Sequence, residues 1–518
     1  MIRLARLTRF LPGAGGGRAD DFVEYWRHDA RALLAHPGCP ICGLLPDTAR
    51  NLFFWFLEER YCHAETLERL TASYGFCPDH TAGLVRSRAS YRIAVLHSLL
   101  FARIIPRLGE LLELVREAGP SRRLLERLHH LQPSRACLAC EELAEAADWA
   151  IRTLARCLAL PDLLEAYLAH PHGLCVVHFR AVARLAPRPV LEPLCRRQSE
   201  LLSALQGDLD RFLQRGVDPG GGWAPPSDDL AKAVAAVVEA TVGPDPMAPE
   251  RGSRPLTGIL PADDADRRPG SHNAVETLAG LLPHQACPVC ALRDRALGTY
   301  LGWLDREGRT RLAGRGTLDH PDPYCPSHTR AVLAAVHPPV AAHLAGARLA
   351  RDLGQLQDGA ARLAGRAPRP VLASLALRDR IEELLPELRR RRLLGEARAI
   401  LTRPAGCALC AHIAETERRT LQLLFALLQD PRPRQAFVEG WGPCVPHFLQ
   451  GLSLAPPREV LRVLAERQLA RLSVLRWEVD ELIRKSGWDV RHEPKGAEQS
   501  AWRRAAEHLG GEAPGPLT

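Results

Sequence analysis

The sequence contains very little lysine. Only three of its 68 basic residues are lysines (Lys232, Lys485 and Lys495), and the formal net charge is +8 over 518 residues. Arginine alternates with glutamate and aspartate along the expected helices, so the charges do not gather into the basic stripe that nucleic-acid-binding proteins present. The composition therefore disfavours a nucleic-acid partner.

Long hydrophobic runs are also absent. No stretch approaches the roughly 18 apolar residues of a membrane span, and the best run, residues 52–57, suits one face of a short buried helix. The first nine residues include three arginines, and no apolar core of signal-peptide length follows them. We therefore expect a cytoplasmic protein, in which cysteines serve as metal ligands or redox thiols rather than as disulfides.

Motifs of common enzyme classes are missing as well. The glycines at 15–17 have no Lys-Ser/Thr after them, and those at 220–222 lie in a Pro- and Gly-rich segment, so neither run forms a phosphate-binding loop. No Ser-His-Asp order and no paired carboxylates stand out. The sequence thus favours a role without catalysis, while leaving that question open.

What the sequence does contain is a recurring pattern of cysteine and histidine. A CxxC pair is followed after 33 or 34 residues by a CxxH pair four times along the chain, which uses 12 of the 15 cysteines. Two thiolates three residues apart can share one tetrahedral metal ion, and a CxxH pair completes four ligands. The expected ligand sets are Cys39, Cys42, Cys77 and His80; Cys137, Cys140, Cys175 and His178; Cys287, Cys290, Cys325 and His328; and Cys407, Cys410, Cys444 and His447.

Zinc is the metal that this ligand set favours. Four protein ligands leave no position for water, which is typical of structural zinc, and we expect four zinc ions per chain. An iron-sulfur cluster with one histidine ligand stays open as an alternative. So do metal-free redox thiols, because CPIC (39–42) and CPVC (287–290) resemble the CPxC motif of glutaredoxin-like enzymes. That motif follows a strand, however, and the redox hypothesis gives the CxxH pairs no role.

The hydrophobic pattern predicts an all-α fold without strands. Residues 20–35 are expected to form a helix that leads to the first CxxC pair. Residues 46–60 and 64–73 could then run out and back as a helical hairpin, which would return Cys77 to Cys42. Residues 90–116 carry apolar side chains at helical spacing, with Pro106 as an expected kink. Each module is therefore predicted to be a hairpin closed by its own CxxC…CxxH metal site.

Comparison of the two halves predicts a tandem duplication. A shift of 248 residues places His36 on His284 and Trp55 on Trp303 without a gap, and a shift of 269 or 270 places the second module on the fourth. The expected division is a flexible leader (1–19), an N-terminal helical domain (20–215, with modules 20–119 and 120–215), a linker (216–275), a C-terminal helical domain (276–485, with modules 276–366 and 367–485) and a polar tail with one short helix (486–518).

Several conspicuous residues lie outside the ligand pattern. Cys62, Cys157 and Cys195 have no matching cysteine in the other half, and we expect them to be small buried side chains. Trp55 and Trp303 are expected to anchor the hairpin cores. His36 and His284, three residues before their CxxC pairs, could support a ligand or cap the preceding helix. The histidines without a counterpart are expected at the surface: His129, His130, His170 and His172.

The motifs together resemble a bacterial helical family of unknown function. They are CPIC (39–42), GFC with His80 (75–80), GLC with His178 (173–178), and EPKG (493–496) leading to AWRRA (501–505). The resemblance implies a two-module helical unit and supplies no activity. It covers residues 276–510 most completely and the first half as a diverged copy, in which residues 223–240 keep only a loose echo of the tail.

Two hypotheses for function follow. The first is a cytoplasmic, all-helical scaffold or interaction protein with an unknown protein partner, in which four closed zinc sites fix the bases of the hairpins. The second is a cytoplasmic redox or electron-transfer protein that uses the CxxC thiols or iron-sulfur clusters.

Overall fold

The computed structural model describes residues 19–117, 122–215, 228–244, 274–313, 324–364, 386–402, 406–490 and 492–511. The regular elements in these ranges are helices, with no strand, which confirms the all-α class. No helix among them is long and apolar enough to cross a membrane. The expected leader, apart from residue 19, and most of the expected linker lie outside the described residues.

Helices of the first half match the expected segments 20–35, 64–73 and 90–116 to within one residue, whereas the helix expected from residue 46 begins at Pro40 and contains Pro46. They are α1 (Ala19–Leu34), α2 (Pro40–Trp55) with its π-helical continuation η2 (Phe56–Arg60), α3 (Ala64–Ser73), α4 (Pro78–Arg86), α5 (Ser90–Arg116), α6 (Arg122–His130), α7 (Leu138–Cys157), α8 (Pro161–Ala169), α9 (Val176–Leu185), α10 (Arg188–Arg215) and α11 (Asp228–Val242).

The second half follows the same plan. Its helices are α13 (Ala274–Leu281), α14 (Pro288–Ala313), α15 (Pro326–Ala335), α16 (Pro338–Leu363), α18 (Pro386–Leu401), α19 (Ala408–Leu427), α20 (Pro431–Glu439), α21 (Val445–Ser453), α22 (Arg458–Lys485), η5 (Trp488–Val490), η6 (Ala497–Ser500) and α23 (Ala501–Gly510).

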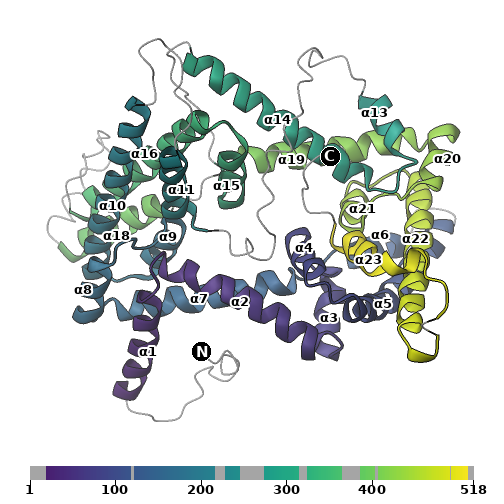
Figure 1. Ribbon diagram of the computed structural model, residues 1–518, viewed down its shortest axis with the longest axis horizontal. Coiled ribbons are helices and arrows are strands. Elements are labelled where there is room, and N and C mark those ends of the chain that lie inside the picture. The colour runs from purple at the N-terminus through teal and green to yellow at the C-terminus, as the bar shows by residue number, and fades with distance from the viewer. Residues whose placement is uncertain are drawn as a thin grey trace.

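Two antiparallel helix pairs connect two blocks of helices (Figure 1). In one bridge α2 packs on α7, and an ion pair of 3.1 Å between Arg60 and Glu142 joins the far end of η2 to the first turn of α7. In the other bridge α14 packs on α19, where the rings of Tyr300 and His412 lie 5.6 Å apart. The α10/α16 block lies at the left of the view and the α5/α22 block at the right (Figure 1).

Each block is built around a long helix from each half of the chain. Helix α5 packs along α22, and α10 packs along α16, with buried apolar residues of both halves in each core. The bridge explains this exchange, because at 1.5 Å per residue a helix of 20 residues spans about 30 Å and holds α5 and α10 at opposite ends. Residues of both expected domains, 20–215 and 276–485, therefore contribute to both cores.

Helix α5 confirms the apolar stripe that its sequence predicts. Seven of its residues at helical spacing are at most 2% exposed: Ile93, Leu96, Leu100, Ile104, Leu108, Leu111 and Val115. Pro106 lies inside α5, which continues past it to Arg116. Burial of the stripe against α22 offsets the backbone hydrogen bond that proline cannot donate.

The bridge helices overturn the expectation for the two matched tryptophans. Trp55 is 50% exposed and Trp303 is 47% exposed, so neither anchors a core. A helix that packs mainly on one partner leaves much of its circumference open, and both tryptophans lie on that side. Cys157 and Cys195 are buried as expected, whereas Cys62 is exposed at the turn between η2 and α3, contrary to the prediction.

Candidate metal centres

All sixteen predicted ligand residues lie in four clusters, each with three cysteines and one histidine. Within a cluster one donor atom from each side chain lies within 4.8 Å of the others. The clusters are centre 1 (Cys39, Cys42, Cys175 and His178), centre 2 (Cys77, His80, Cys137 and Cys140), centre 3 (Cys287, Cys290, Cys444 and His447) and centre 4 (Cys325, His328, Cys407 and Cys410).

The predicted pairing of the motifs is wrong. Each CxxC pair meets the CxxH pair of the other module in its half, so Cys39 and Cys42 join Cys175 rather than Cys77. Helix lengths explain the difference. The outward run of α2 and η2 covers residues 40–60, whereas α3 returns over only ten residues, about 15 Å. Cys77 therefore stays near the far end of the bridge, where Cys137 immediately precedes α7.

Distances between the donor atoms match one tetrahedral ion. Metal–sulfur bonds of about 2.3 Å at tetrahedral angles place two sulfurs about 3.8 Å apart and a sulfur and a nitrogen about 3.5 Å apart. Each centre has a pair of Sγ atoms 3.7 or 3.8 Å apart. The Sγ–Nδ1 distances lie between 3.1 and 3.7 Å. All four histidines point Nδ1 at the sulfurs.

Helix starts position the ligands, as the sequence predicts. The first cysteine of each motif immediately precedes a helix, and its partner lies in the first turn. Proline occupies the first turn of α2, α4, α15 and α21, where its missing N–H costs no hydrogen bond. The free N–H groups at a helix start favour thiolate, and the Cys410 amide donates to Cys407 Sγ at 3.4 Å.

The crowded thiols shift one another's pKa in opposite directions. Burial raises the pKa of Cys407, but hydrogen bonds from neighbouring ligands outweigh it and hold that pKa below its ordinary value. Burial and the adjacent Cys407 raise the pKa of Cys410 to about 12. Three thiolates this close repel one another, and a divalent cation among them would relieve the repulsion.

Two of the ligand histidines, His80 and His447, show the same demand for positive charge. Burial lowers the pKa of His80, yet hydrogen bonds to Cys137 and Cys140 raise it to about 9, and His447 reaches about 9 in the same way beside Cys290. A proton on the imidazole then takes the place of the metal's charge. The donor set thus fits a divalent, thiophilic ion.

Centres 2 and 3 differ at the outward nitrogen of the histidine. His447 Nε2 lies 3.2 Å from Oε1 of Glu417 on α19, so a metal-bound His447 can donate its remaining N–H to a carboxylate. Glu417 also accepts from Gln450 at 3.2 Å. Nε2 of His80 is buried and has no hydrogen-bond partner. The sequence did not identify Glu417. Its contact with His447 depends on how the helices pack, which the sequence pattern does not show.

Centres 1 and 3 are covered, and centres 2 and 4 are open. The three cysteines of centre 1 and those of centre 3 are all buried, whereas Cys140 of centre 2 and Cys410 of centre 4 are exposed. The glycines that follow α11 and α23 lie over the covered centres. A Cβ on Gly243 would lie 2.5 Å from Cys42 Sγ and 3.4 Å from Cys175 Sγ, and one on Gly511 would lie 3.8 Å from Cys444 Sγ.

Arginines lie beside the covered centres. Arg330 of α15 donates to the carbonyls of Val242 and Gly243 at 3.3 and 3.1 Å, and its charge favours the Cys42 thiolate. Burial lowers the pKa of Arg293, but the nearby Cys290 and Asp294 raise it above its ordinary value. These cations offset the net charge near −1 that three thiolates and one imidazole leave around a divalent ion.

Two histidines outside the ligand sets, His36 and His170, support the backbone. His36 Nδ1 accepts from the Gly38 amide at 3.1 Å, so it orders the turn before the CxxC pair and contacts no sulfur. His170 is buried, and its Nε2 lies 2.8 Å from the His36 carbonyl oxygen. The expectation of a surface position is therefore wrong for His170. In the other half the Trp441 amide donates to the His284 carbonyl at 3.0 Å, a comparable contact at the matching site.

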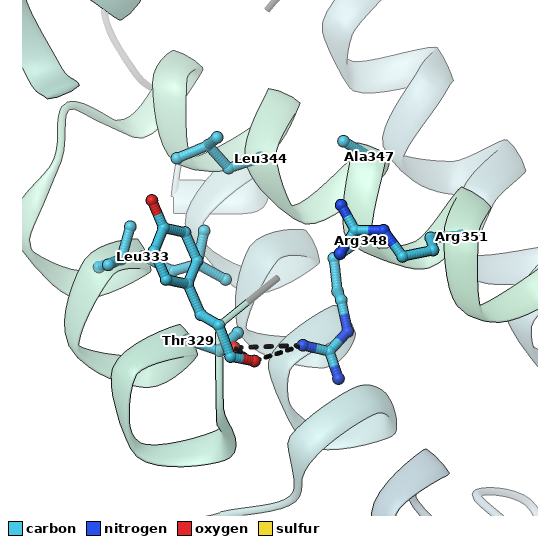
Figure 2. A pocket seen from close by; sticks show the side chains of 8 residues that line it. Thr329, Leu333, Leu344, Ala347, Arg348 and Arg351 are labelled. Carbon is cyan, nitrogen blue, oxygen red and sulfur yellow. Dashed lines mark hydrogen bonds between the residues drawn. The ribbon is translucent and has the colours of Figure 1, made fainter. Parts of the chain in front are cut away.

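A small pocket lies beside Tyr324, the residue before Cys325, between α15 and α16 (Figure 2). Arg348 Nη1 donates to the Tyr324 carbonyl and to Thr329 Oγ1, at 3.0 and 3.3 Å. Its Nε donates to Asp352 at 2.7 Å, and Arg180 reaches the same carboxylate at 2.8 Å. The polar groups are thus paired, and they join helices of the two halves.

Comparison with known proteins finds a family model that matches most of the first half. Residues 30–214 match DUF6062, a family of unknown function. The DUF6062 match spans both modules of the first half and the ligands of centres 1 and 2. We expected the more complete family resemblance in residues 276–510, whereas the family model matches the first half. The curated proteins and the solved structures contain no match to this chain.

Proposed function

We propose that the protein is a zinc-bound helical scaffold, in which four structural ions fasten the two bridges to the two blocks. The tetrahedral spacing of the donor atoms carries this proposal. Each centre joins the start of a bridge helix to the start of a CxxH helix. Ions at the four centres would therefore fix both ends of each bridge to the two blocks. Closed sets of four protein ligands favour a structural over a catalytic role.

The same spacing argues against the alternatives. An iron-sulfur cluster spreads its ligands over several irons, whereas these donors surround a single point. A glutaredoxin-like role needs a strand before the CPxC motif, and α2 and α14 follow helical segments among the described residues. Zinc is therefore favoured over iron-sulfur chemistry and over free redox thiols.

The proposal also includes a cytoplasmic location, a protein partner and a tandem duplication. Thiolate centres persist best in a reducing compartment, which supports a cytoplasmic location. The exposed Trp55 and Trp303 support a protein partner that contacts the bridges. Both halves join the CxxC pair of one module to the CxxH pair of the other, and this shared pairing supports a tandem duplication.

Metal analysis of the reduced protein tests the proposal. We expect about four zinc ions per chain, and about three in Cys444→Ser, with local loss of helix packing around α21 because bound zinc is coupled to folding. Cys195→Ser is the matched control, since Cys195 is equally buried but belongs to no centre. A chain purified with sufficient zinc under reducing conditions that holds no zinc would refute the proposal, and so would one that holds iron and labile sulfide.

A further inference from the structure

The second cysteine of each CxxC pair has two different environments. At the covered centres Cys42 is 5% exposed and Cys290 is fully buried, whereas Cys140 and Cys410 at the open centres reach solvent. Cys140 and Cys410 occupy matching positions of the second and fourth modules, so the difference is repeated in both halves. Four centres with the same ligands thus form two classes.

Access for a small molecule follows from this difference. The backbone at Gly243 approaches Cys42 so closely that there is no room for a Cβ, and Gly511 packs against Pro446 at centre 3. The end of α23 also lies beside Pro78 at centre 2, but Cys140 there and Cys410 at centre 4 are exposed to solvent. A metal-bound thiolate stays nucleophilic, so exposure decides which thiolate an oxidant meets.

We propose that Cys140 and Cys410 are oxidation sites for hydrogen peroxide, through which the two open centres release their metal while the two covered centres keep theirs. This inference rests on the proposed metal-bound function. It adds that two of the four ions are held conditionally, and that the condition is the oxidation state of an exposed thiolate.

The chemistry at centre 4 balances with peroxide as the two-electron oxidant. The Cys410 thiolate attacks one peroxide oxygen, the O–O bond breaks, and hydroxide leaves and takes up a proton to form water. The Cys407 thiolate then attacks the sulfur of the sulfenic acid, which forms the disulfide and releases a second hydroxide that is protonated to water. Two thiolates, one peroxide and two protons thus give one disulfide and two water molecules. Cys137 and Cys140 react in the same way.

Loss of both thiolates leaves only Cys325 and His328 at centre 4, which are too few ligands to retain zinc. The ion leaves, and the start of α19 is no longer fastened to α15. The start of α7 is freed from α4 at centre 2 in the same way. Centres 1 and 3 still fasten the other end of each bridge. Oxidation therefore frees one end of each bridge and leaves the other end attached to its block.

The test uses the full chain with its bound zinc counted first. Peroxide is added in the presence of a chromogenic zinc chelator, and the disulfides are then mapped by mass spectrometry. We expect two ions per chain to be released at least about tenfold faster than the other two, with disulfides 137–140 and 407–410. In Cys410→Ser one fast ion is already absent, whereas the matched variant Cys290→Ser holds three ions and still releases two quickly.

The outcomes separate the two proposals. A chain with no zinc before treatment contradicts the proposed function. Four ions released at one rate, no ion released, or disulfides at 39–42 and 287–290 would overturn the oxidation proposal alone. Disulfide mapping on the unmodified chain decides the matter even if a serine variant fails to fold.

Discussion

Centres 1 and 3 have the same ligands as centres 2 and 4 but a different cover. The covered centres combine the CxxC pair of the first module in a half with the CxxH pair of the second, and the helix after that second module ends over them. The open centres combine the motifs the other way round, and Cys140 and Cys410 are exposed there. Centres with the same ligands therefore differ in how accessible their thiols are, because the surrounding helices rather than the ligands decide access.

A methyl group added at Gly243, which lies over centre 1, should have the largest effect on zinc content and stability. In Gly243→Ala the new methyl group would lie 2.5 Å from Cys42 Sγ, at a backbone φ of +72° that alanine rarely adopts. We expect centre 1 to lose its ion and the free energy of unfolding to fall by about 3 kcal/mol or more.

Gly511→Ala is the matched control for that prediction. It has a similar φ of +79°, but its nearest contact would be Pro446 at 3.4 Å, so only backbone strain of about 1–3 kcal/mol is expected and zinc content should stay unchanged. Zinc analysis and denaturant unfolding measure both variants. Equal zinc in both would show that the glycine does not protect centre 1.

Acid should weaken the cover of centre 3. His508 of α23 is buried, accepts from Trp441 Nε1 at 2.7 Å, and lies 3.0 Å from the Gln468 amide. Burial lowers its pKa to about 3, with help from Arg471 and Arg467. An undocked His508 titrates near 6.5. The docking energy is therefore complete above pH 6.5 and declines as the pH falls toward 3, by about 2 kcal/mol at pH 5.

Hydrogen exchange of residues 501–510, corrected for the intrinsic pH dependence, measures this change. Protection should fall between pH 7 and pH 5 in the unmodified chain. His508→Asn keeps a polar partner for Trp441 without titrating, so its protection should vary much less over that range. An equal decline in both would exclude His508 as the cause.

The carboxylate at centre 3 should give the smallest effect. In Glu417→Gln the amide oxygen can still accept from His447, but the negative charge that favours the metal-bound imidazole is lost. We expect the affinity of centre 3 for zinc to fall about tenfold. Chelator competition measures it, and Glu415→Gln, an exposed neighbour paired with Arg418 and Arg419, is the control. No difference between the two variants would remove Glu417 from the centre.

The local pattern was enough to predict which residues gather, but not how they pair. Each motif at a helix start, and the buried stripe of α5, follows from spacing and helical periodicity alone. The partner of Cys39 depends instead on the length of α2 and η2 relative to α3, and a spacer of 34 residues is equally compatible with a hairpin and with a bridge. The exposure of Trp55 and the approach of Gly243 to Cys42 were hidden for the same reason, since both depend on which helices pack together.

The packing of long helices from one half against those of the other affects the stability of either half alone. Helices α5 and α10 belong to one half but bury their apolar faces against α22 and α16 of the other. A polypeptide with only the first of these halves would leave both faces bare to water. We expect such a half to be unstable as a monomer unless another chain covers those faces.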